Sequence, residues 1–104
     1  MALIKSCLAS GGAISFDTPT NISSGASNIT LNVTEGKTYI LGGLFGTSPE
    51  SITPTGGTVL SVKASSGGYT DGGRTYVTGY MVIKATASTI ALGTYGDFGY
   101  VEMD

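Results

Sequence analysis

The sequence predicts an all-β protein, a single domain over residues 1–104 that folds as a jelly-roll-like antiparallel β-sandwich with about seven short strands. Two observations favour this class. No segment carries an apolar stripe at the 3.6-residue helical period, whereas several short apolar or alternating segments lie between turn residues. Gly, Ser and Thr together make up 44 of the 104 residues, which is typical of a turn-rich β domain with a hydroxyl-rich exterior.

The clearest alternation lies at residues 28–34, where apolar and polar side chains follow one another over seven positions. This period of two is typical of a strand with one face in solvent. Residues 37–45 are apolar at both parities, which predicts a strand that is covered on both faces. Glu35 and Gly36 between the two segments predict a tight hairpin that pairs them.

The chain continues with a Pro- and Gly-containing loop and then with further strands, which we expect at 58–65, 74–85, 88–92 and 95–103. The first of these is expected to turn Leu60, Val62 and Ala64 toward the core. In the second, we expect the odd positions from Val77 to Ile83 to face the core and the even positions to lie on the opposite face.

Residues 65–73, SSGGYTDGG, contain two Gly-Gly pairs. They lack the Lys-Ser/Thr of a phosphate-binding loop, and no helix follows them. Glycine adopts positive φ without strain, so we expect both pairs to form turns between antiparallel strands.

The charge content excludes several classes of partner. Only 12% of the residues are charged, against roughly a quarter in an ordinary soluble domain, and the net charge is −2. Five basic residues spread along the chain provide no patch for nucleic acid. No window is long and apolar enough for a membrane span, and three apolar residues before Lys5 are too few for a signal peptide, which predicts a protein made in the cytoplasm and not exported by a leader.

The reagents of common catalysis are scarce, so we expect a protein that is not an enzyme and has no catalytic, cofactor-binding or metal-binding residues. The absence of histidine removes the commonest general base and metal ligand. A glycosidase needs two facing carboxylates across a cleft, for which so short a sandwich has little room. Asp71 and Asp97 lie in Gly-rich segments, where aspartate commonly forms turns rather than calcium sites.

Two further features have structural interpretations. Cys7 has no second cysteine or histidine to pair with, which predicts a structural, buried or half-buried thiol. Asn-x-Ser/Thr sequons occur at Asn21, Asn28 and Asn32, and we expect them to stay unmodified because no signal peptide precedes them.

The even positions of segment 74–85 carry two aromatic rings with little charge around them, and further candidates lie just upstream. Tyr and Arg are enriched in protein interfaces because they offer large contact area and a polar tip. The candidates for an interface with a protein partner or a glycan are therefore Tyr69, Arg74, Tyr76, Thr78 and Tyr80. The alternative is that these tyrosines only pack across the sheet.

The start MALIKSC, the phrase ITLNVTEGKTYIL, and the ending YMVIKATASTIAL followed by GYVEMD resemble the small β-rich virion proteins of tailed bacteriophages, particularly those of gut Gram-positive bacteria. The likeness covers most of the chain in segment order. It implies a sandwich or jelly-roll domain located in the virion, where it oligomerises, often as a trimer, and docks on other virion proteins of the capsid or tail. It implies no catalytic residue.

Two functions from different classes remain open. In the first, the chain is a non-enzymatic structural component of a phage particle, such as a capsid decoration protein or a tail-associated protein. In the second, it is a module that binds a host-surface glycan or receptor through the region from Tyr69 to Tyr80.

Overall fold

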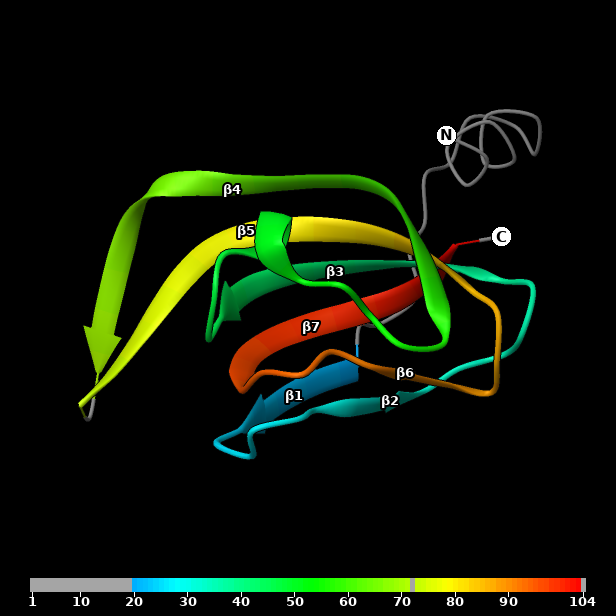
Figure 1. The fold of residues 1–104 in the computed structure, drawn as a ribbon, viewed down its shortest axis with the longest axis horizontal. Coiled ribbons are helices and arrows are strands. Elements are labelled where there is room, and N and C mark those ends of the chain that lie inside the picture. The colour runs from blue at the N-terminus through cyan, green and yellow to red at the C-terminus, as the bar shows by residue number, and fades with distance from the viewer. Residues whose placement is uncertain (1–19, 72, 104) are drawn as a thin grey trace, which may run out of the picture.

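Two antiparallel sheets form the fold in the computed structural model, which describes residues 20–71 and 73–103 (Figure 1). The larger sheet has the order β1-β7-β3-β5-β4, whose strands are Thr20–Ser24, Gly96–Met103, Thr38–Phe45, Arg74–Ala85 and Gly57–Asp71. The smaller sheet pairs β2, Thr30–Asn32, with β6, Thr89–Ala91, and the 3-10 helix η1, Pro49–Ser51, precedes β4. The predicted all-β, antiparallel class is confirmed, whereas the jelly-roll connectivity stays a prediction. Cys7 lies outside the described residues.

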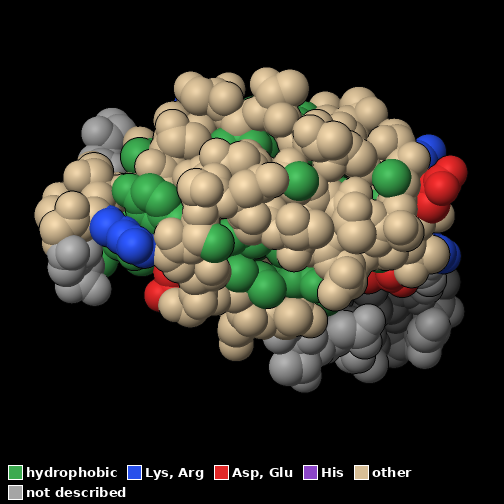
Figure 2. All heavy atoms as spheres, turned by 60° about the horizontal axis from the view of Figure 1, so that its bottom comes forward, with side chains coloured by type: hydrophobic (Ala, Val, Ile, Leu, Met, Phe, Trp, Pro, Cys, Tyr) green, Lys and Arg blue, Asp and Glu red, His purple; other side chains and the backbone are tan. Residues whose placement is uncertain are grey.

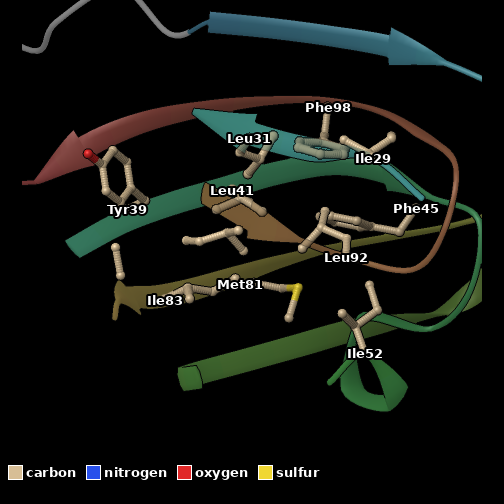
Figure 3. Close-up of a cluster of buried hydrophobic side chains, with 12 residues drawn as sticks. Ile29, Leu31, Tyr39, Leu41, Phe45, Ile52, Met81, Ile83, Leu92 and Phe98 are labelled. Carbon is tan, nitrogen blue, oxygen red and sulfur yellow. The ribbon is translucent and has the colours of Figure 1, made fainter. Parts of the chain in front are cut away.

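The hydrophobic core lies between the two sheets (Figure 3). Side chains of β3, β5 and β7 point into the same space as those of the small sheet and the loop after η1. Phe45 and Phe98 stack toward one end of it, with ring centroids 5.0 Å apart (Figure 3). Each large side chain buried here contributes about 1.5–3 kcal/mol to stability. The buried core residues are Ile29, Leu31, Tyr39, Leu41, Phe45, Ile52, Met81, Ile83, Ala85, Ile90, Leu92 and Phe98.

Strand β3 is the centre of the large sheet because it pairs with β5 on one edge and with β7 on the other. Tyr39, Leu41 and Phe45 are buried on its core side. On its other side Ile40 and Leu44 are only half-buried and Gly42 is exposed, so the predicted cover on both faces is found on the core side alone among the described residues. On β5, Met81 and Ile83 are fully buried, whereas Thr78 and Lys84 are exposed. The prediction that the odd positions of this strand form the core face is therefore confirmed.

The predicted hairpin between residues 28–34 and 37–45 is wrong. Strand β2 pairs with β6, and β3 pairs with β5 and β7. The turn itself exists, since the backbone N–H of Lys37 donates to the carbonyl of Thr34 and Gly36 has φ of 90°. It carries the chain from the small sheet to the large one, because Leu31 is buried against the core from the opposite layer.

The expectation that Leu60 faces the core is also wrong. Val59 lies opposite Ile83 and Ser61 lies opposite Val82, so Leu60 is an extra residue in a β-bulge. A bulge shifts the alternation of the strand by one position. Leu60 is consequently 57% exposed.

The predicted loop at residues 65–73 is mostly strand. β4 continues to Asp71 after a second irregularity between Ala64 and Gly68, where the Glu50 carboxylate accepts a hydrogen bond from the backbone N–H of Ala64 at 3.3 Å. The first Gly-Gly pair lies within this strand rather than in a turn. Of the second pair, Gly73 lies in the turn before β5 with φ of 80°, as predicted, and Gly72 lies outside the described residues. Figure 1 shows the hairpin of β4 and β5 bending and reaching past the ends of β3 and β7.

Gly79 permits a close approach of η1 to the sheet, which gives a test of this packing. A Cβ at Gly79 would lie 2.4 Å from the carbonyl oxygen of Lys63 and 2.7 Å from Cγ of Pro49. We expect Gly79→Ala to lower the free energy of unfolding by about 1–3 kcal/mol because a backbone atom must move. The measurement is urea denaturation.

The matched control is Gly68→Ala in the same hairpin, where a Cβ would meet its nearest neighbours at ordinary contact distances of 3.7 and 3.9 Å. Its stability should change by less than about 1 kcal/mol. Equal stability of the two variants would contradict the packing of η1 on Gly79.

Candidate functional site

The large sheet has a second side, opposite to the core, that the described residues leave uncovered. Residues that lie directly opposite one another on paired strands share a face, so the register of β5, β3 and β7 defines this surface. We call it the outer face. Its residues on these three strands are Thr38, Ile40, Gly42, Leu44, Thr78, Tyr80, Val82, Lys84, Asp97, Gly99, Val101 and Met103.

The middle of the outer face is apolar. Val82, Ile40 and Val101 form one row across β5, β3 and β7, and all three are half-buried. Leu44 is half-buried one level away on β3. A row of aliphatic side chains at the centre of a sheet face is typical of a surface that packs against another layer.

A hollow interrupts this face where two glycines lie side by side. Gly42 of β3 is in register with Gly99 of β7, and a Cβ placed on Gly42 would meet nothing within 4 Å. The hollow has a volume of about 380 Å³ and is lined by Asn21, Ile40, Gly42, Gly99, Tyr100 and Val101. Glycine inside a strand often marks a place where a ligand or another chain approaches closely.

Tyr80 stands beside this hollow, because it lies opposite Gly42 on the neighbouring strand β5. Its side chain is 42% exposed. Its hydroxyl lies 3.4 Å from the hydroxyl of Ser61, so the ring leans toward β4 and leaves the hollow open. The exposed ring can insert into a partner, and the neighbouring apolar hollow can accommodate a side chain of that partner.

The bent end of the β4–β5 hairpin carries a separate group of rings. Tyr76 is half-buried and lies 6.3 Å from the ring of Tyr69 and 5.5 Å from the ring of Tyr95, the latter in an edge-to-face arrangement. The guanidinium of Arg74 lies 5.2 Å from the centre of the Tyr95 ring. We call Tyr69, Arg74, Tyr76 and Tyr95 the tip cluster.

The tip cluster ties the hairpin to neighbouring loops. The Tyr95 hydroxyl donates a hydrogen bond to the carbonyl of Thr75 at 2.9 Å. The guanidinium of Arg74 occupies the space that a Cβ at Gly25 would need, so it packs on the loop between β1 and β2. Tyr69 is 50% exposed, whereas Tyr76 is enclosed by the two other rings.

The five predicted interface residues therefore fall into two groups. Thr78 and Tyr80 lie on the outer face, while Tyr69, Arg74 and Tyr76 belong to the tip cluster. Gly42 and Gly99, which shape the hollow, were not predicted. Tyr95 was also missed, because it lies 19 residues from Tyr76 in sequence and only the pairing of β7 with β3 brings it near.

A second hollow of about 370 Å³ opens at the other end of the sandwich. In it the Tyr39 hydroxyl donates to the Glu102 carboxylate at 2.8 Å and accepts from the backbone N–H of Thr34 at 2.7 Å. Glu102 is the one carboxylate among the described residues that line this hollow. A two-carboxylate hydrolytic pair has no second member there, and the hydrogen bonds tie β7 to the turn before β3.

The surface carries little charge. Figure 2 shows one side of the molecule, where uncharged polar side chains and backbone dominate and charged groups lie toward the ends. Within residues 20–71 and 73–103, no three Cys, Asp or Glu side chains gather in a way that could hold a metal ion. In the same residues no helix has the length and apolar character needed to cross a membrane.

Comparisons of the chain with protein families, with curated proteins and with solved structures give no match.

The tip cluster yields a prediction about local stability. Tyr95→Ala removes the edge-to-face ring contact, the contact with Arg74 and the hydrogen bond to Thr75, each worth on the order of 1 kcal/mol. We expect amide hydrogen exchange in residues 68–76 to accelerate at least tenfold. Tyr69→Ala removes one ring contact at the exposed rim and should accelerate exchange much less, so equal effects of the two variants would contradict this account.

Tyr39 yields a second prediction, on global stability. Tyr39→Phe keeps the buried ring and deletes the hydroxyl, which leaves the N–H of Thr34 and the carboxylate of Glu102 without this partner. The free energy of unfolding should fall by about 1–3 kcal/mol. Tyr100→Phe is the control, because its hydroxyl makes one long hydrogen bond of 3.4 Å to Asn32. A larger loss in the control than in Tyr39→Phe would show that the Tyr39 hydroxyl is not the stabilising group.

Proposed function

We propose that this protein is a non-enzymatic structural component of a bacteriophage particle, a capsid decoration or tail-associated protein located in the virion. It acts by associating with copies of itself and by docking on other virion proteins. The resemblance to small β-rich virion proteins supports the setting, and the outer face supports the mode of action.

The observation that carries this proposal is the apolar outer face of the large sheet. Antiparallel sheets commonly pack one face on the core and present a polar face to water. Here the centre of the second face is occupied by Ile40, Val82 and Val101 instead of charged side chains. Such a face gains free energy when another protein layer covers it, at roughly 25 cal/mol for each Å² of apolar surface buried.

The tip cluster fits a supporting role in this function. Its rings and Arg74 hold the bent hairpin against the loops at the end of the sandwich. Tyr69 at its exposed rim remains available for contact with a neighbouring virion protein.

A second candidate is a module that binds a host-surface glycan, and the exposed Tyr80 ring beside the Gly42–Gly99 hollow favours it. Sugar rings stack on exposed aromatic side chains, and the amide of Asn21 at the hollow offers hydrogen bonds. In this function Tyr80→Ala abolishes binding to host cells and leaves particle assembly intact. Unchanged binding by that variant would remove the glycan function.

The structural function is tested by particle composition. Mass spectrometry of purified particles of the phage that encodes this chain should find it in a fixed ratio to the major capsid or tail protein. The control is a non-structural protein of the same phage, which should be depleted by the purification. Absence of the chain from particles that are otherwise complete would contradict the proposal.

A further inference from the structure

We propose that two copies of this chain pair through the outer face, about a two-fold axis that runs along β3, with the Tyr80 ring of each copy in the Gly42–Gly99 hollow of the other. This inference rests on the proposed structural function and names the partner of that surface. When the same face is used on both subunits, the assembly is complete with two copies and has no free face for a third.

The register of the sheet determines which residues face each other in such a dimer. Strands β5 and β7 flank β3 and are both antiparallel to it, so they run parallel to each other. A two-fold axis along β3 places β5 of one copy against β7 of the other at the same level. Tyr80 and Gly99 lie at one level because both are opposite Gly42. Tyr80 therefore meets the partner's Gly99, the largest side chain of the face against the smallest.

The direction of the ring agrees with this match. Tyr80 leans away from β3 toward β4, as its contact with Ser61 shows. The hollow is likewise displaced from β3 toward the other edge, since Asn21 of β1 lines it together with Gly99 of β7. The same two-fold rotation brings the displaced ring over the displaced hollow.

At the neighbouring levels, apolar residues of one copy lie against apolar residues of the other. Val82 lies opposite Ile40 on one side of β3, and Val101 lies opposite Ile40 on the other. The rotation places Val82 against the partner's Val101. It places Ile40 and Leu44, which lie on the axis strand, against their own copies.

Charged side chains of the face do not oppose charges of the same sign. Lys84 and Met103 share a level, as do Thr78 and Asp97, and Lys63 shares the level of Tyr80. Under the rotation each lysine meets an uncharged residue, and Asp97 meets a hydroxyl. The facing pairs are Lys84 with the partner's Met103, Asp97 with the partner's Thr78, and Lys63 with the partner's Asn21.

The area suffices for a modest dimer. Five strands spaced roughly 4.8 Å apart, with about eight residues of each in the face except for the five of β1, present about 600 Å² at roughly 3.4 Å per residue. Two such faces bury about 1,200 Å², which is the lower limit of standard protein interfaces. We therefore expect a dimer that dissociates on dilution.

The first test is sedimentation equilibrium of the full chain over a concentration series, with two variants. Tyr80→Ala empties the hollow, and Gly42→Leu projects a side chain into it from a position where a Cβ meets no atom within 4 Å. Each should raise the dimer dissociation constant at least roughly 30-fold, the effect of losing an interface hot spot. Circular dichroism checks that both variants fold. Thr89→Ala, at an exposed position of β6 in the small sheet, should leave the dissociation constant unchanged.

The second test mixes the two variants. A heterodimer of Tyr80→Ala with Gly42→Leu keeps one ring in one open hollow and places the small Ala side chain over the filled hollow. We expect this mixture to form dimers more strongly than either variant alone. A surface that associates through general stickiness would show no such complementation.

Three results would overturn the inference: a wild-type monomer at all concentrations, a trimer that neither variant weakens, or a mixture no stronger than its parts. These results are independent of the particle composition test. A chain found in virions but monomeric in solution would remove the self-pairing and leave the structural function standing. If the chain forms dimers that show complementation but is absent from virions, the structural function is removed and the self-pairing stands.

Discussion

The pairing of β3 on both edges is the constraint on which the rest of the structure depends. Because β5 and β7 both hydrogen bond to β3, the side chains of all three strands alternate in step. Residues at the same level of the three strands therefore point to the same face of the sheet. One face stacks Phe45 on Phe98 and closes the core with the small sheet. The same register fixes the opposite face, where Tyr80, Gly42 and Gly99 lie in one row. Core packing and the proposed contact surface are thus two consequences of one set of hydrogen bonds.

Much of this division could be predicted from the sequence. The alternation in residues 74–85 placed Met81 and Ile83 in the core and Tyr80 outside, because period two leaves no other arrangement for a strand with one covered face. The apolar residues at both parities of 37–45 predicted two covered faces. The described residues cover one of them, the core face, whereas the other carries the half-buried apolar centre of the outer face.

The remainder depends on contacts between segments distant in sequence. A Gly-containing turn between two apolar segments normally forms a hairpin, yet the burial of Leu31 in the opposite layer gives its strand a different partner, β6. The bulge that exposes Leu60 depends on the register with β5, which alternation within β4 does not reveal. For the same reason the hollow could not be predicted, since Gly42 and Gly99 become neighbours only when β7 pairs with β3.

The proposed pairing of two outer faces brings the Tyr80 ring of one copy next to the hollow of the other. The most direct measurement is an isotope-filtered NMR experiment on dimers mixed from labelled and unlabelled chains, which records proton contacts between copies only. We expect contacts from the Tyr80 ring to Gly99 and Asn21 of the other copy. Dimers without such contacts, or with intermolecular contacts confined to the tip cluster, would contradict this pairing.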